Sequence, residues 1–137
     1  MGRMSTKYRV QNPKNNEIVE SFDFITDDEL ETALATANDT FKQWREKSFS
    51  ERAEVLRKVA KLFDEQRAEL TRIIAEEMGK SVKEGDGEIN DVVEIFNYYA
   101  DNGAEFGADE EIPNQRGGTS VMRKVPLGVI LGIMPWN

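Results

Sequence analysis

The residues best placed to do chemistry follow an apolar run, where Pro135, Trp136 and Asn137 come after residues 129–134. That run contains no charged residue, follows a Pro-x-Gly turn and is closed by Pro135, which is typical of a central strand covered on both faces. In open α/β sheets, ligands bind beyond the carboxyl ends of such strands. We therefore expect Asn137 to lie where a cofactor or a reacting group is bound, in the front part of a larger enzyme.

Composition excludes several other chemistries. The 137 residues include no cysteine and no histidine, so the chain offers no thiolate nucleophile, no imidazole base and no ordinary zinc site. Its net charge of -8 argues against nucleic-acid binding, which depends on clustered lysines and arginines. No apolar stretch approaches the roughly 20 residues that span a bilayer, and no apolar signal-peptide segment is present. We predict an acidic, soluble, cytoplasmic protein without a nucleic-acid, membrane or metal partner.

Small strands and helices must position this segment. A central turn flanked by alternating apolar residues predicts a short hairpin within residues 8–24. Thr26 and Glu29 have the spacing of a capping box, so a helix should begin at Asp27. Its apolar side chains recur at helical spacing, which predicts one buried face as far as Trp44.

Two further helices are predicted. An apolar stripe indicates a long helix over residues 50–78, on the order of 40 Å at about 1.5 Å per residue, unless it bends near Gln66. Gly79 suits the left-handed residue that ends a helix. Ser81 then opens a third helix, whose apolar stripe extends to Phe106.

Glycines and polar residues shape the rest of the chain. Gly85 and Gly87 weaken the third helix by about 1 kcal/mol each relative to alanine, or instead permit close backbone packing. Residues 107–119 predict a polar connector in which residues 109–111 form a solvated acidic loop. Residues 120–125 alternate in the manner of a strand and precede the predicted buried strand.

Several short segments along the chain form a recognisable set. They are Asn12-Pro13 with Glu17-Ile18-Val19, Trp44 ahead of Glu51-Arg52-Ala53, Glu77-Met78-Gly79-Lys80, Gly87-Glu88-Ile89, Tyr98-Tyr99-Ala100, and Pro126-Leu127-Gly128-Val129 leading to Pro135-Trp136-Asn137. With these segments the chain resembles, over nearly its whole length, the N-terminal part of the aldehyde dehydrogenase superfamily. The Glu-Met-Gly-Lys and Gly-Glu-Ile segments look most like those of succinate-semialdehyde dehydrogenases.

This resemblance implies an α/β fold, in which the chain is the mostly helical N-terminal part of a cofactor-binding domain. Residues 1–119 would form the helical part, residues 120–127 an oligomerisation strand segment, and residues 128–137 the first buried strand of the Rossmann-like cofactor-binding sheet. The parent would be a homo-oligomer, a dimer or a tetramer. The long helices would form the shell of the cofactor domain.

The resemblance also implies a reaction and a site. The parent would oxidise an aldehyde, succinate semialdehyde in the closest branch, to a carboxylic acid with NAD or NADP as cofactor. The side-chain amide of Asn137 would donate to the oxyanion formed when a cysteine thiolate attacks, worth on the order of 3 kcal/mol in a dry site. The cofactor would be lined by Ile133, Met134, Pro135, Trp136 and Asn137.

Other parts of the family pattern are expected beyond Asn137. They are the glycine-rich cofactor turn, the residues that distinguish NAD from NADP, the general-base glutamate and the nucleophilic cysteine. We therefore predict that these 137 residues alone are catalytically inactive.

Plainer interpretations stand beside these expectations. Pro135, Trp136 and Asn137 could form an ordinary turn, and the chain could be a non-catalytic binding or assembly module built from the same helices. Against a self-sufficient module, the strand over residues 129–134 has no charge or proline to protect its edges. An independent nucleotide-binding domain is disfavoured because no Gly-x-Gly-x-x-Gly turn follows a strand. For Glu88 we favour a structural hydrogen bond to backbone over catalysis.

Overall fold

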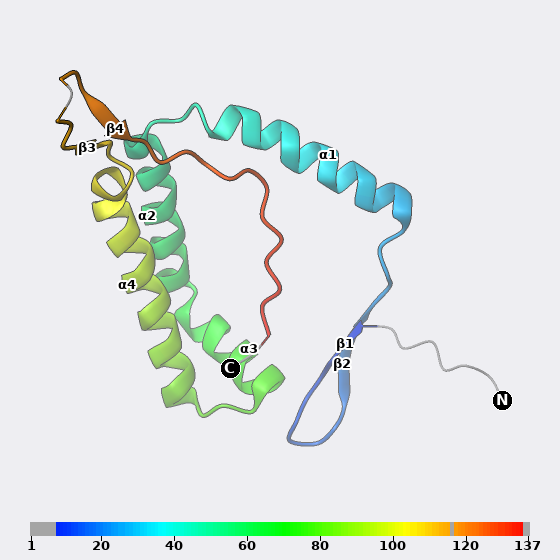
Figure 1. Cartoon of the computed structure of the whole chain (residues 1–137). Helices are drawn as coiled ribbons and strands as arrows, with labels where there is room; N and C mark the ends of the chain where they lie inside the picture. The colour runs from blue at the N-terminus through cyan, green and yellow to red at the C-terminus, as the bar shows by residue number, and fades with distance from the viewer. Residues whose placement is uncertain (1–7, 116, 136–137) are drawn as a thin grey trace.

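The computed structural model describes residues 8–115 and 117–135, and it is mostly helical (Figure 1). The elements are β1 (Tyr8–Gln11), β2 (Ile18–Phe22), α1 (Asp27–Trp44), α2 (Phe49–Glu65), α3 (Arg67–Met78), α4 (Val82–Phe106), β3 (Glu110–Ile112) and β4 (Ser120–Met122). Within the described residues no helix is long and apolar enough to cross a membrane.

Capping boxes fix where three of the helices begin. Thr26 caps α1 and Ser81 caps α4, each with a glutamate three residues later, as the sequence predicts. Ser48 caps α2 in the same way, a signal that the sequence carries and that places the start of this helix just before Ser50. Hydrogen bonds from the Ser48 backbone and from the Lys47 and Ser48 side chains lower the pKa of Glu51 to about 2. These reciprocal hydrogen bonds of the capping boxes satisfy backbone amide groups that have no partner within the helix.

The predicted long helix is two helices. It bends at Gln66, whose φ of -98° and ψ of 11° interrupt the helix between α2 and α3. This is the position at which the sequence allowed a bend. Arg67 holds the joint, because its guanidinium donates to Asp64 at 2.8 Å and to Asp86 of α4 at 3.2 Å. Gly79 ends α3 at a φ of 73°, as predicted.

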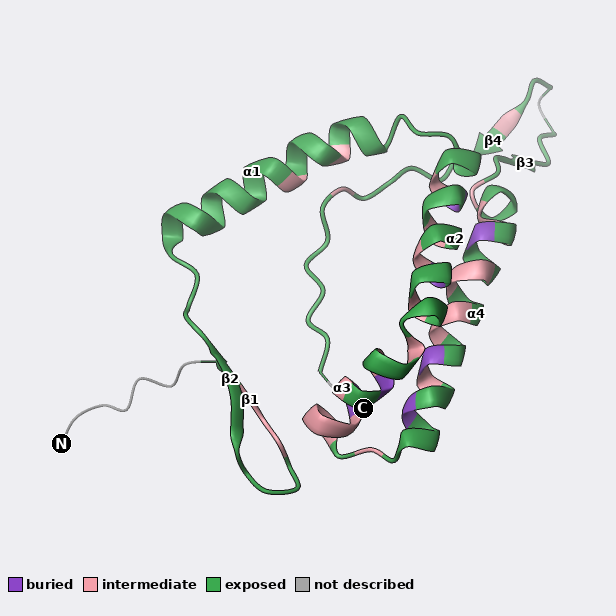
Figure 2. Ribbon diagram, turned by 180° about the vertical axis from the view of Figure 1, so that it is seen from behind, coloured by how far each residue is buried: buried purple, intermediate pink, exposed green. Residues whose placement is uncertain are grey.

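The core lies where α4 packs along α2 and α3 (Figure 2). Its buried apolar side chains, among the described residues, are those of Ala53, Ala60, Ile74, Ile89 and Ala100. Gly85 permits the close approach of α3, since a Cβ there would lie 3.2 Å from Cγ2 of Thr71. A Cβ on Gly87 would meet nothing within 4 Å, so of these two glycines only Gly85 permits close packing of the helices. Small residues thus dominate a thin core.

Helix α1 corrects one expectation. It lies apart from α2, α3 and α4 (Figure 1), and none of its residues is buried. Leu30, Leu34 and Trp44 on the predicted buried face are 43%, 50% and 42% exposed. Its periodicity is that of an amphipathic helix, but none of the described elements packs extensively against it.

The first hairpin forms as predicted. β1 and β2 pair antiparallel, from Tyr8 opposite Phe22 to Gln11 opposite Ile18, with a register shift after Val10. Asn16 closes the turn with a φ of 62°, a left-handed conformation that asparagine tolerates.

The second hairpin corrects the predicted acidic loop. Glu110 and Glu111 belong to β3, which pairs antiparallel with β4. Two ion pairs lie beside the paired strands β3 and β4. Arg123 contacts Asp109 at 2.6 Å, and Lys124 contacts Glu110 at 2.8 Å. Hydrogen bonds from Arg123 lower the pKa of the Asp109 carboxyl below its ordinary value. The acidic residues therefore have cross-strand partners that local charge patterning did not indicate.

Candidate functional site

The predicted cofactor-lining segment is extended and exposed. Ile133 and Met134 are 80% and 89% exposed, and Pro135 is exposed as well. Trp136 and Asn137, the predicted cofactor contact and the predicted catalytic amide, lie outside the described residues. The expected site is therefore not assembled by the part of the chain that the structure describes.

Residues 129–134 likewise form no strand in this structure, which corrects the predicted buried strand. The segment crosses the open space between α1 and the packed helices (Figure 1). A strand requires a neighbour for its N–H and C=O groups, and both described sheets are separate two-stranded hairpins. Exposed apolar side chains in an unpaired segment need a covering partner.

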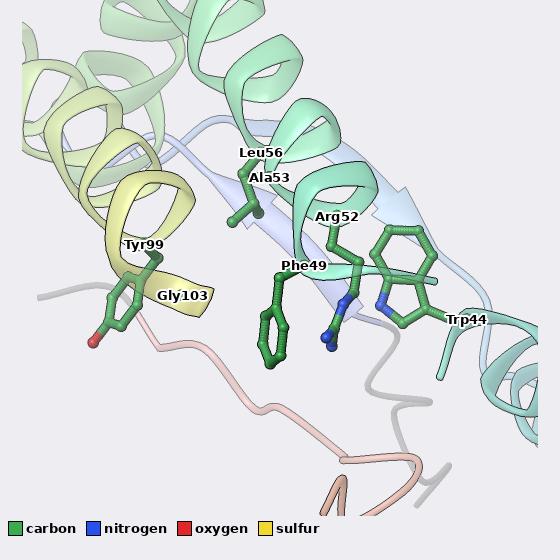
Figure 3. A pocket seen from close by; sticks show the side chains of 7 residues that line it. All are labelled: Trp44, Phe49, Arg52, Ala53, Leu56, Tyr99 and Gly103. Atoms are coloured by element: carbon green, nitrogen blue, oxygen red, sulfur yellow. The ribbon is translucent and has the colours of Figure 1, made fainter. Parts of the chain in front are cut away.

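A concave feature with aromatic walls lies where the start of α2 meets the end of α4 (Figure 3). We call this hollow of about 280 Å³ the aromatic hollow. Its lining residues are Trp44, Phe49, Arg52, Ala53, Leu56, Tyr99 and Gly103.

Arg52 supplies the charge of the aromatic hollow. Its guanidinium carbon lies 4.3 Å from the centroid of the Phe49 ring, a cation–π contact across one helical turn. Its Nε is shielded from solvent and donates to no acceptor among the described residues. The residue stands in the first turn of α2, where a helix dipole favours negative charge. The sequence motifs give Arg52 no role beyond its place in the Glu51-Arg52-Ala53 segment, although an arginine three residues after an aromatic residue in a first helical turn is a readable signal.

Phe49 joins the two ends of the helical pair. A Cβ on Gly107, just after α4, would lie 2.7 Å from Cε1 of the Phe49 ring. A side chain at this position would require the ring or the end of α4 to move. The start of α2 is thereby fixed to the end of α4.

A second polar cluster lies at the opposite end of α4, where Lys80 pairs with Glu88. The two side chains are 21% and 32% exposed, so the pair is partly buried. In place of the predicted hydrogen bond between the Glu88 carboxylate and backbone, Glu88 accepts from the ammonium group of the lysine that follows Gly79. The pair connects the α3–α4 turn to α4 and provides no nucleophile.

The described residues contain no group of three or more acidic, histidine or cysteine side chains that could hold a metal ion.

Comparison with known proteins gives a family match over the chain. The model of the "Aldehyde dehydrogenase family" matches residues 2–137. The chain is 35% identical over 135 residues to the succinate-semialdehyde dehydrogenase (NADP+) of Deinococcus radiodurans, covering 98% of this chain and 28% of that protein. It is 36% identical over 128 residues to succinate-semialdehyde dehydrogenase (NADP+) 1 of Mycobacterium tuberculosis, and the match covers 92% of this chain and 28% of that protein.

Solved structures also align with this chain. The succinic semialdehyde dehydrogenase of Streptococcus pyogenes, in complex with NADP+, aligns with a TM-score of 0.78 and 30% identity over 83% of this chain and 25% of that one. The protein Gox0499 aligns with a TM-score of 0.85 and 27% identity over 88% of this chain and 26% of that one. The chain spans about 28% of the length of the curated relatives it matches.

Proposed function

The chain belongs to the aldehyde dehydrogenase family, and we propose that it is the N-terminal portion of an enzyme that oxidises succinate semialdehyde to a carboxylic acid. The observation that carries this proposal is the match over residues 2–137, together with relatives named succinate-semialdehyde dehydrogenases at about 35% identity. The exposed apolar faces of α1 and residues 129–134 support a portion of a larger protein over a self-sufficient binding module.

The cofactor proposed for the parent is NADP or NAD. The relatives' names specify NADP+, and the streptococcal structure contains NADP+. When bound, this cofactor accepts the hydride that leaves the substrate. The described segment fits a lining role, since Ile133, Met134 and Pro135 present exposed apolar side chains on an extended backbone.

The role proposed for Asn137 is to stabilise negative charge on the substrate oxygen. Its side-chain amide donates hydrogen bonds without changing protonation, which suits an oxyanion in a site that excludes water. Trp136 is proposed to pack near the adenosine half of the cofactor. Residues 120–125 are proposed to take part in assembly of a dimer or a tetramer.

The test uses the full-length parent enzyme. We expect aldehyde-dependent reduction of NADP+ or NAD+ with succinate semialdehyde, followed at the absorbance of the reduced nicotinamide. The Asn137→Ala variant should lower kcat by about 10²- to 10³-fold, as loss of one oxyanion donor does. Asn137→Asp serves as the matched control for shape, since it keeps the side-chain volume and removes the amide donors. Absence of turnover in the unmodified parent would contradict the proposal, and the 137-residue chain alone should show none.

A further inference from the structure

The aromatic hollow contains a cation that lacks an anionic partner among the described residues. Four other arginines, Arg57, Arg67, Arg72 and Arg123, each contact a carboxylate at 2.8 Å or less. Arg52 instead rests on the Phe49 ring, with its Nε shielded from solvent and without an acceptor. In a chain with a net charge of -8, this lack of a partner does not result from a shortage of carboxylates.

The nearest carboxylate in sequence is already engaged. Glu51 accepts hydrogen bonds from the Ser48 backbone at 2.8 Å and from Lys47 Nζ at 3.0 Å. The Asp101 carboxylate on α4 accepts from Arg57 at 2.5 Å. The dipole of α2 also disfavours a cation in its first turn. A shielded donor in an unfavourable position is costly unless something outside the described residues accepts from it.

The walls of the hollow indicate what that acceptor is attached to. Phe49 and Trp44 lie on either side of Arg52, and Tyr99 lines the hollow beyond the Phe49 ring (Figure 3). A Cβ on Gly103, which also lines the hollow, would meet nothing within 4 Å. Tryptophan, tyrosine and arginine are the residues enriched at the centres of protein interfaces. Aromatic rings around an arginine suit a carboxylate flanked by apolar side chains, because the rings exclude water and the planar guanidinium binds both carboxylate oxygens.

We propose that the aromatic hollow is covered by a later segment of the same parent polypeptide, which presents an aspartate or glutamate carboxylate to Arg52. This inference rests on the proposed function, in which the chain is joined to the rest of an aldehyde dehydrogenase. The relatives are more than three times as long as the matched region, since it is 28% of their length. A segment tethered to the hollow has a high effective concentration there.

Zero-length cross-linking tests the proposal in the full-length parent. The Arg52→Lys variant places an amine in the hollow, and a carbodiimide then couples that amine to a carboxylate in direct contact. Peptide mass spectrometry should find position 52 joined to an aspartate or glutamate beyond residue 137 of the same chain. Mixing isotope-labelled and unlabelled protein separates this from a link between two copies. A link to a second copy, a link only within residues 1–137, or no link would overturn the proposal.

Thermal unfolding gives an independent readout. The Arg52→Met variant keeps the apolar stem and leaves the partner carboxylate without its cation, so the full-length Tm should fall by about 3 °C or more. The matched control is Arg57→Met, whose exposed partner Asp101 belongs to this chain and whose effect should be about 1 °C or less. An equal effect of the two substitutions would contradict a covered ion pair at Arg52. Turnover by the unmodified parent tests the proposed function separately, so the two failures are distinguishable.

Discussion

The ring of Phe49 lies directly against the main chain of Gly107, so that an added Cβ there would lie 2.7 Å from Cε1 of the ring. This contact joins residues far apart in sequence and fixes the ends of α2 and α4 together.

Replacing this glycine should therefore be costly. Gly107→Ala forces the Phe49 ring or the end of α4 to move, and we expect the free energy of unfolding to fall by about 1–3 kcal/mol. Gly103→Ala is the control, because a Cβ at that helical position meets nothing within 4 Å. It should leave stability unchanged or raise it by up to about 1 kcal/mol through helix propensity. Urea unfolding of both variants measures the difference, and equal effects would refute the contact.

A second pair of glycines gives a test inside the core. Gly85 is buried against Thr71 and Ile74, whose methyl groups lie 3.2 and 3.5 Å from an added Cβ. Gly85→Val should destabilise the α3–α4 packing by about 1–3 kcal/mol. At Gly87 an added Cβ meets open space, so Gly87→Ala should be neutral or stabilising by up to about 1 kcal/mol. Chemical denaturation monitored by circular dichroism checks both values, and a neutral Gly85→Val would show that the helices can separate there without cost.

The capping box of α2 predicts a dependence on pH. The pKa of Glu51 is lowered from 4.5 to about 2, first by the Ser48 backbone hydrogen bond. Because the folded state holds this carboxylate ionised, the stabilisation is present above pH 4.5 and is lost as pH falls toward about 2. Glu51→Gln should reduce the loss of stability over that acid range while keeping the capping geometry. Thermal unfolding between pH 5 and about pH 2 measures it, and identical slopes for the two proteins would exclude Glu51 as a contributor.

Loss of the cap itself provides a separate measurement. Ser48→Ala removes the hydroxyl that accepts from the Glu51 amide at 3.2 Å, and should lower stability by about 1 kcal/mol. Ser48→Asp restores a capping oxygen and should recover most of the loss. If alanine and aspartate behaved alike in equilibrium unfolding, the start of α2 would be independent of its cap.

Burial distinguishes the Lys80–Glu88 ion pair from the surface pairs. Its side chains are 21% and 32% exposed, whereas those of Lys42 and Asp39 are 64% and 69% exposed. A double-mutant cycle with Lys80→Met and Glu88→Gln should give a coupling free energy above about 0.5 kcal/mol. The same cycle at Lys42 and Asp39 should give less, because water and salt screen exposed pairs. A coupling no larger than that of the surface pair would remove the structural role of Glu88.

Features that depend on neighbours three or four residues apart could be predicted from the sequence. The capping boxes of Thr26 and Ser81 and the left-handed Gly79 are local, since each is decided by one helical turn. The box at Ser48 has the same spacing and could have been found in the same way.

Features that depend on residues distant in sequence could not be predicted from the sequence. The composition of the α1 stripe and of residues 129–134 predicts a core, but burial requires an opposing surface, and none of these residues is buried in the structure. Strand β3 is not indicated by its own residues, because it pairs with β4 across the intervening turn. The cations that contact Asp109 and Glu110 lie beyond that turn as well, at Arg123 and Lys124. The family resemblance, by contrast, rested on motifs along the whole chain and is confirmed by the match over residues 2–137.

The exposed apolar residues 127–134 also bear on how such a polypeptide is made. During synthesis, the helical unit of α2, α3 and α4 emerges from the ribosome before residues 127–134 do. Leu127, Leu131 and Met134 are each at least 85% exposed, within an extended backbone. A nascent chain at this stage displays the kind of apolar surface that drives aggregation and that chaperones bind.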